Sequence, residues 1–142
     1  MAMSGERADR LRDIGLLVLR VGIGVMFVHH GWPKISGGPQ MWAKIGGAMA
    51  NFGITFTPAF WGLMAALSEF GGGLCLIAGF KTRIAALFMA STMTVAVTMH
   101  LSRGDSLAVA SHAIEAGVVF LSLVLIGAGK YSLDARIAGR RR

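Results

Sequence analysis

Residues 58–80 are PAFWGLMAALSEFGGGLCLIAGF, an apolar run of helical length that contains a single charged side chain, Glu69. Three further apolar segments share this character, at residues 14–30, 84–101 and 107–129. Each is close to the ~17–25 residues that span the hydrocarbon core of a bilayer, and none shows the period-2 alternation of a strand. Hydrophobic residues make up 54% of the chain, which favours an all-α integral membrane protein over a soluble domain.

The connections between these segments predict an up-down four-helix bundle. The links at residues 80–83 and 102–106 are so short that the helices they join must be antiparallel neighbours. Residues 31–57 form a longer connection, which we expect to begin with a turn at Gly31-Trp32-Pro33.

Within that connection a short interfacial helix is predicted between the first and second spans. It is indicated by apolar residues at helical spacing, namely Met41, Trp42, Ile45, Met49 and Phe52. Gly53 is suited to a left-handed end for this helix. The helix could act as a lid over the bundle or as a membrane-surface anchor.

The basic residues predict the orientation, because Lys and Arg near span ends stay on the cytoplasmic side. With a cytoplasmic N-terminus, most of the cations fall inside: Arg7, Arg10, Arg12, Lys81, Arg83, Lys130, Arg136, Arg140, Arg141 and Arg142. Only Lys34, Lys44 and Arg103 are translocated. We therefore expect a basic cytoplasmic N-terminus (residues 1–13), a transmembrane domain (14–129) and a basic cytoplasmic C-terminal tail (130–142). The net charge of +7 then reflects topology and contact with lipid headgroups, not nucleic-acid binding.

Ionisable side chains are predicted to gather in the outer half of the bundle. Because successive helices alternate in direction, similar depths are expected for His30, Glu69, His100, His112 and Glu115. Ionisable groups at membrane depth usually face the interior and mark function, since inserting each costs at least ~2.5–3.5 kcal/mol. His112 and Glu115 are spaced i, i+3 and so face the same way. The pattern predicts a polar pocket, with Glu69 and Glu115 as proton-carrying groups.

Other polar residues are expected to have structural roles, namely Arg20, Arg83 and Asp134. Arg20 lies in the cytoplasmic half of the first span, where Asp134 or lipid headgroups could satisfy it. Either Ser132 or Asp134 is expected to cap a short final helix. The single cysteine, Cys75, has no partner in the chain, and no CxxC motif is present, which disfavours dithiol chemistry.

Several short motifs, in this order, resemble the DoxX family of small bacterial membrane proteins. They are Leu19-Arg20-Val21-Gly22, His30-Gly31-Trp32-Pro33-Lys34, Glu69 with Gly72-Gly73, Thr82-Arg83, and Gly127-Ala128-Gly129-Lys130-Tyr131-Ser132-Leu133-Asp134. The resemblance covers essentially the whole chain. It implies a four-helix protein of the bacterial inner membrane. The family that the chain resembles takes its name from its similarity to a subunit of thiosulfate:quinone oxidoreductase. Some of its members are linked to membrane complexes that couple thiol and superoxide detoxification.

The resemblance favours a subunit of a membrane redox complex whose outer pocket binds a quinone. In that hypothesis Glu69 and Glu115 move protons, and the ligand is contacted by His30, Lys34, His100 and His112. No flavin, dinucleotide or iron–sulfur motif is present, so electrons would come from other redox proteins or a prosthetic group. We assign no reaction to the chain alone.

A second hypothesis is a binding or assembly protein without turnover. Met26 and His30, and Met89, Met93 and His100, follow helix faces that could bind copper(I). Haem held by two of His30, His100 and His112 is a further alternative, and a scaffold would need no ligand. Small-residue faces also leave a homo-oligomer open.

Overall fold

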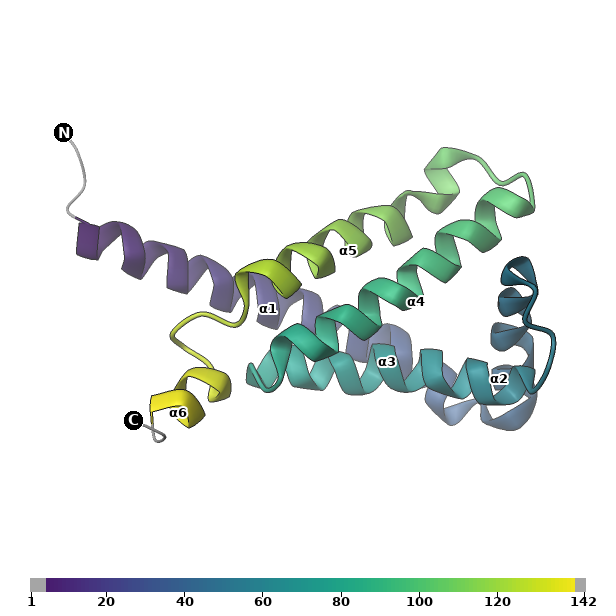
Figure 1. The fold of residues 1–142 in the computed structure, drawn as a ribbon, viewed down its shortest axis with the longest axis horizontal. Helices are drawn as coiled ribbons and strands as arrows, with labels where there is room; N and C mark the ends of the chain where they lie inside the picture. The colour runs from purple at the N-terminus through teal and green to yellow at the C-terminus, as the bar shows by residue number, and fades with distance from the viewer. Residues whose placement is uncertain (1–4, 140–142) are drawn as a thin grey trace.

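The computed structural model describes residues 5–139, and every regular element in that range is helical (Figure 1). The elements in chain order are α1 (Gly5–Ser36), α2 (Gly38–Gly46), the 3₁₀ helix η1 (Gly47–Phe52), α3 (Pro58–Ala78), α4 (Thr82–Ser102), α5 (Leu107–Ile126) and α6 (Leu133–Gly139). The all-α prediction is confirmed.

The predicted four-helix bundle is not confirmed, and the helix count differs. Within residues 5–139 three helices are long and apolar enough to cross a membrane, namely α3, α4 and α5. The first predicted span, residues 14–30, is only the middle of α1, which is 32 residues long.

The turn expected at Gly31-Trp32-Pro33 is wrong, because α1 continues through it to Ser36. The reason is tertiary packing. Gly31 is buried, and a Cβ there would collide with the backbone of Phe70, so this turn of α1 lies directly against α3. Such close packing outweighs the local preference of Pro33 to end a helix.

α3 is the central helix of the fold. It packs against α1 on one side, against α4 on another, and against α2 near its own N-terminus. Glycines allow two of these approaches: a Cβ on Gly73 would collide with the backbone of Gly24 in α1, and one on Gly72 would collide with Met89 in α4. Small residues at helix contacts are what membrane helices use to approach closely.

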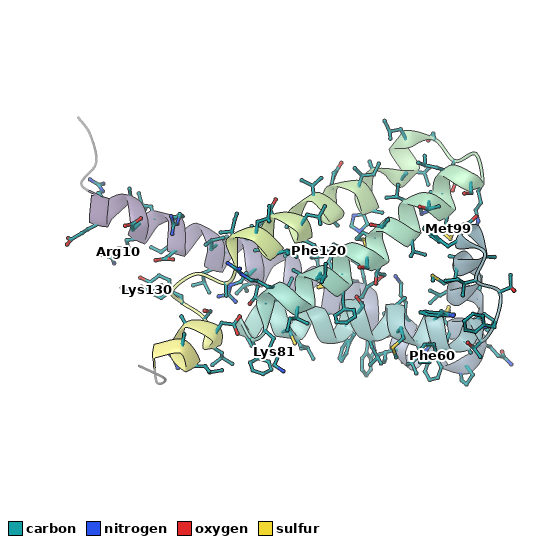
Figure 2. All side chains as sticks on the ribbon, viewed as in Figure 1. Arg10, Phe60, Lys81, Met99, Phe120 and Lys130 are labelled. Carbon is teal, nitrogen blue, oxygen red and sulfur yellow. The ribbon has the colours of Figure 1, made fainter. Side chains whose placement is uncertain are left out.

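The α4–α5 hairpin diverges from the α1–α3 pair, so the molecule is wedge-shaped (Figure 1). The start of α1 and α6 both lie on the side of the molecule away from the wide end, and Arg10, Lys81 and Lys130 lie on that side too (Figure 2). α2 and η1 lie at the wide end (Figure 1), where both contact α3 and η1 also contacts α4. The predicted short helix between the first two spans is therefore present, and its end at Gly53 is left-handed as expected (φ 75°).

Arg20 holds the narrow end together. It is fully buried and donates hydrogen bonds to the carbonyls of Leu76 (2.6 Å), Ile77 (3.3 Å) and Tyr131 (2.6 Å). It therefore joins α1 to the end of α3 and to the segment before α6. Arg20 neither reaches headgroups nor forms a hydrogen bond with Asp134, because unsatisfied backbone carbonyls at the end of a helix are nearer partners.

Asp134 instead caps the start of α4. Its carboxylate accepts hydrogen bonds from the backbone N–H groups of Lys81 (2.7 Å) and Thr82 (2.9 Å). α6 is capped by Ser132, whose Oγ accepts from the N–H of Ala135 (3.1 Å). Arg83 donates to the carbonyl of Leu125 (3.2 Å) and so links α4 to the end of α5. Of the predicted basic tail, residues 140–142 lie outside the described residues.

Replacing Arg20 should loosen the narrow end. Arg20→Met would leave the three carbonyls without their charged donor, at a cost on the order of 3 kcal/mol of unfolding free energy. Denaturant unfolding of the detergent-solubilised protein measures this, with Arg12→Met, an exposed arginine on the same helix, as the control. Equal stability of the two variants would contradict the role assigned to Arg20.

The contact between α2 and α3 should be sensitive to a single methyl group. A Cβ on Gly62 would collide with the backbone of Trp42, whereas one on Gly71 of the same helix meets nothing within 4 Å. Gly62→Ala should cost about 1–3 kcal/mol through overpacking, and Gly71→Ala should not. Hydrogen exchange over residues 38–52 checks this, because only Gly62→Ala should raise it.

Candidate functional site

A pocket of about 190 Å³ lies where α1, α3, α4 and α5 meet near the wide end of the wedge. We call it the central pocket. Five ionisable side chains line it, and they come from all four helices: His30 and Lys34, Glu69, His100, and His112. Apolar residues complete the wall, namely Phe27, Met93, Ala96, Val109 and Ala113. The pocket is thus a polar space inside an apolar protein.

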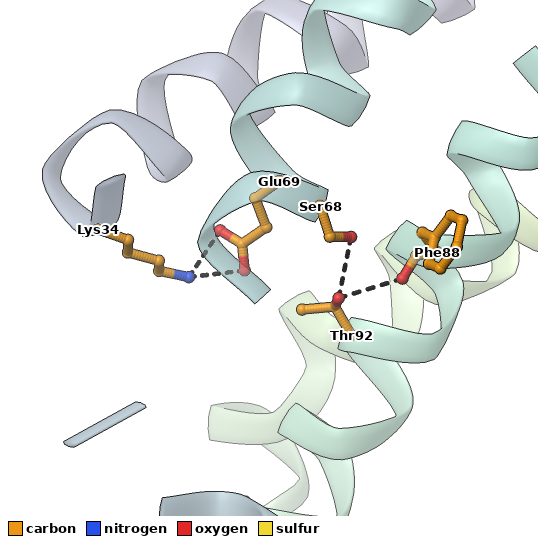
Figure 3. Close-up of polar contacts among 5 residues, drawn as sticks. All are labelled: Lys34, Ser68, Glu69, Phe88 and Thr92. Carbon is orange, nitrogen blue, oxygen red and sulfur yellow. Dashed lines mark hydrogen bonds and ion pairs between the residues drawn. The ribbon is translucent and has the colours of Figure 1, made fainter. Parts of the chain in front are cut away.

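An ion pair between Lys34 and Glu69 forms one wall of the central pocket (Figure 3). The ammonium nitrogen of Lys34 lies 2.7 Å from Oε1 and 2.6 Å from Oε2 of Glu69. The Glu69 side chain is 4% exposed and that of Lys34 is 35% exposed. Because Glu69 is buried, Lys34 is the partner that makes its charge tolerable there, and Lys34 keeps a further N–H donor for another group.

Two further hydrogen bonds between helices lie near this pair. The indole N–H of Trp42 in α2 donates to the carbonyl of Lys34 (2.9 Å), which ties α2 to the end of α1. Beside Glu69, the hydroxyls of Ser68 and Thr92 lie 3.0 Å apart and join α3 to α4 (Figure 3). These bonds link α2 to α1 and α3 to α4 in the neighbourhood of the ion pair.

Three aromatic rings form another part of the wall. The ring centroids of His30 and His112 lie 5.2 Å apart, and Phe27 is stacked on His112 at 6.2 Å with an interplanar angle of 10°. Phe27 is 2% exposed. Phe27 packs beside both imidazoles and, having no polar atoms in its side chain, leaves the ring nitrogens of His30 and His112 free of competition from its own side chain.

His100 is held from the α4–α5 connection. Its Nδ1 lies 2.7 Å from Oδ2 of Asp105. A hydrogen bond at Nδ1 leaves Nε2 for another partner and fixes the orientation of the ring.

A second depression, of about 470 Å³, lies between α1 and α5. We call it the lateral groove. Its wall is mostly apolar, with Val18, Leu19, Ile23, Met26 and Val119, and its polar residues are His30, His112 and Glu115. It shares Phe27, His30 and His112 with the central pocket, so the two spaces meet at this aromatic cluster.

The structure thus brings together most of the predicted site residues. His30, Lys34, Glu69, His100 and His112 all line the central pocket. Glu115 does not; it faces the lateral groove next to His112, as the i, i+3 spacing requires. His29 is exposed, as expected for a neighbour of His30 that points elsewhere.

Sequence reasoning missed the Lys34–Glu69 pair and the role of Phe27. The pair was missed because a turn was expected at Pro33, which would have moved Lys34 off the helix. The i, i+4 spacing from His30 to Lys34 was the available signal, since it places both residues on one face of a continuous helix.

The methionines that were predicted as copper(I) ligands lie in three different surroundings. Met93 lines the central pocket, Met26 lies in the lateral groove, and Met89 is fully buried against Gly72. Among residues 5–139 no group of three or more His, Cys, Asp or Glu side chains is arranged to hold a metal ion. Copper and haem binding stay alternative hypotheses.

Comparison with known proteins identifies the family. The DoxX family model matches residues 15–102. "Inner membrane protein YqjF" of Escherichia coli (strain K12) is 34% identical over 132 residues, which cover 88% of this chain and 93% of that protein. "Putative oxidoreductase CatD" of Bacillus subtilis (strain 168) is 33% identical over 85 residues, 60% of this chain and 58% of that protein. No solved structure gives a significant match. With its three apolar helices of spanning length, the chain belongs to the DoxX family of membrane proteins.

Proposed function

We propose that this protein is a subunit of a membrane redox complex and that the central pocket binds the ring of a lipid-soluble quinone. The observation that supports this most is the Lys34–Glu69 ion pair, set with three histidines in the wall of a pocket surrounded by apolar helices. Ionisable groups placed at membrane depth are retained for function more often than for stability. The name of the CatD relative, which contains the word oxidoreductase, supports the redox part.

The proposed placement is the bacterial inner membrane, with both termini in the cytoplasm. The apolar middle of α1, residues 14–30, is proposed as a fourth span beside α3, α4 and α5. Two observations support this: the name of YqjF includes the inner membrane, and Arg10, Lys81 and Lys130 lie on the same side of the molecule as the start of α1 and α6 (Figure 2). The central pocket then lies toward the outer face.

The side chains of the central pocket suit the two ends of a quinone ring. Carbonyl oxygens need donors, which Lys34 and a protonated histidine nitrogen supply; the hydroxyls of the reduced form need acceptors, which Glu69 supplies. The central pocket, at about 190 Å³, is smaller than the ~300–1,000 Å³ of pockets for drug-sized ligands. It therefore suits a single ring and not a whole quinone with its chain.

Reduction of a quinone to a quinol takes two electrons and two protons. We propose that Glu69 and Glu115 pass the protons, and that the electrons come from a partner redox protein. The chain has one cysteine and no CxxC motif, so it holds no dithiol of its own to supply them. The proposed reaction therefore needs an electron source other than a dithiol of this chain.

Removing the ion pair as a unit should weaken quinone binding while sparing the fold. Lys34→Met with Glu69→Met replaces a buried carboxylate and its partly exposed ammonium partner by apolar chains of similar length, and replacing an ion pair in this way is often neutral for stability. The double variant should bind a chain-free quinone about tenfold or more weakly than the wild type. Lys34→Met alone should instead destabilise the protein, because it leaves Glu69 buried and unpaired. Isothermal titration and thermal unfolding in detergent measure the two effects.

The matched control is the adjacent polar pair, which does not line the central pocket. Ser68→Ala with Thr92→Val removes a hydrogen bond between α3 and α4 (Figure 3) and should leave the quinone affinity unchanged. The proposed function is wrong if the double Met variant binds quinone as tightly as the wild type.

A further inference from the structure

We infer that the lateral groove is the entrance from the membrane to the central pocket, and that it holds the apolar chain of an amphiphile whose polar ring occupies that pocket. This inference rests on the proposed function, because it uses the central pocket as the ring site. It adds a class of ligand, a neutral ring with a single apolar chain, and a route of entry between α1 and α5.

The first observation is that the two spaces adjoin. The central pocket and the lateral groove have three wall residues in common, Phe27, His30 and His112. A ligand lying in both spaces would therefore pass the same ring cluster, with its polar part beside Lys34 and Glu69 and its remaining part beside α5.

The second observation is how the helices pair. α1 packs against α3, α3 against α4, and α4 against α5. α1 and α5 meet at rings such as Phe27 and Phe120, whose centroids lie 4.8 Å apart, and the lateral groove lies beside this contact, between the two helices. Gly22 contributes to the opening, since a Cβ there would meet nothing within 4 Å.

The third observation is the chemistry of the groove wall. Val18 is 66% exposed and Met26 is 52% exposed, so this wall presents apolar side chains outward, as suits contact with hydrocarbon. Glu115 and His112 are exposed on the facing helix. Polar groups on a lipid-facing wall are costly unless they find partners, so the occupant must carry hydrogen-bonding groups near one end.

These features select among possible occupants. A transmembrane helix about 10 Å wide fills roughly 420 Å³ per turn, so a groove of about 470 Å³ would accept little more than one turn of it. A phospholipid would bring an anionic phosphate toward the carboxylate of Glu115, which like charge disfavours. A neutral ring with one chain meets neither obstacle.

Filling the groove at Gly22 tests the inference. Gly22→Trp places a large side chain in the lateral groove, whereas Gly15→Trp adds the same side chain to an open, exposed position of α1 outside the groove. The probes are duroquinone, which has no chain, and decylubiquinone, titrated into protein in lipid nanodiscs. Gly22→Trp should weaken decylubiquinone binding about tenfold or more and change duroquinone binding by less than about twofold. Gly15→Trp should change neither.

The possible failures are distinguishable. If the wild type binds both probes and Gly22→Trp leaves decylubiquinone affinity unchanged, the entrance is wrong and the proposed function stands. If the wild type binds neither probe, both proposals fail. Mass spectrometry of the same nanodisc samples would overturn the assigned occupant if a phospholipid, retained by the wild type, were lost in Gly22→Trp. Gly22→Leu, a smaller filling residue, replaces Gly22→Trp if the tryptophan variant does not fold.

Discussion

A buried carboxylate in an apolar helix needs a cation, and the rest of the site follows from how this chain supplies one. Glu69 lies in the middle of α3, and Lys34 reaches it from the end of α1. That reach requires α1 to remain helical past Pro33 and to press its Gly31 against the backbone of Phe70. The long first helix, the close α1–α3 contact and the charged wall of the central pocket are therefore parts of one arrangement.

The two ends of the wedge use different interactions. At the narrow end, Arg20 and Asp134 form hydrogen bonds with backbone groups that the helices leave unsatisfied. The charged side chains there hold the helices together. At the wide end, the helices diverge and the ionisable groups line open space instead. Hydrogen bonds that join the helices at one end limit how far they can move apart at the other, and such restraint favours a preorganised binding site.

Much of the helical content was predictable, because the length of an apolar segment and the glycines near its ends are local features of the sequence. The starts of α3 at Pro58 and of α5 at Leu107 match the predicted segments, and Gly53 ends η1 as expected. The family could also be predicted, from motifs spread along the chain. The course of α1 beyond His30 could not, since it depends on packing against α3 and overrides Pro33. The gathering of His30, His100 and His112 near Glu69 could be predicted from the alternating directions of the helices. The pairing of Lys34 with Glu69 and the position of Glu115 in a separate groove could not, because both depend on how α1 packs against its neighbours.

The central claim is that the pocket beside Lys34 and Glu69 is a quinone site, and native mass spectrometry of the protein released from its own membranes tests it most directly. The account predicts one quinone retained per chain, with a mass that includes its apolar chain. A protein that carries copper or haem instead, or that stays empty after its membranes are supplemented with quinone, would contradict it.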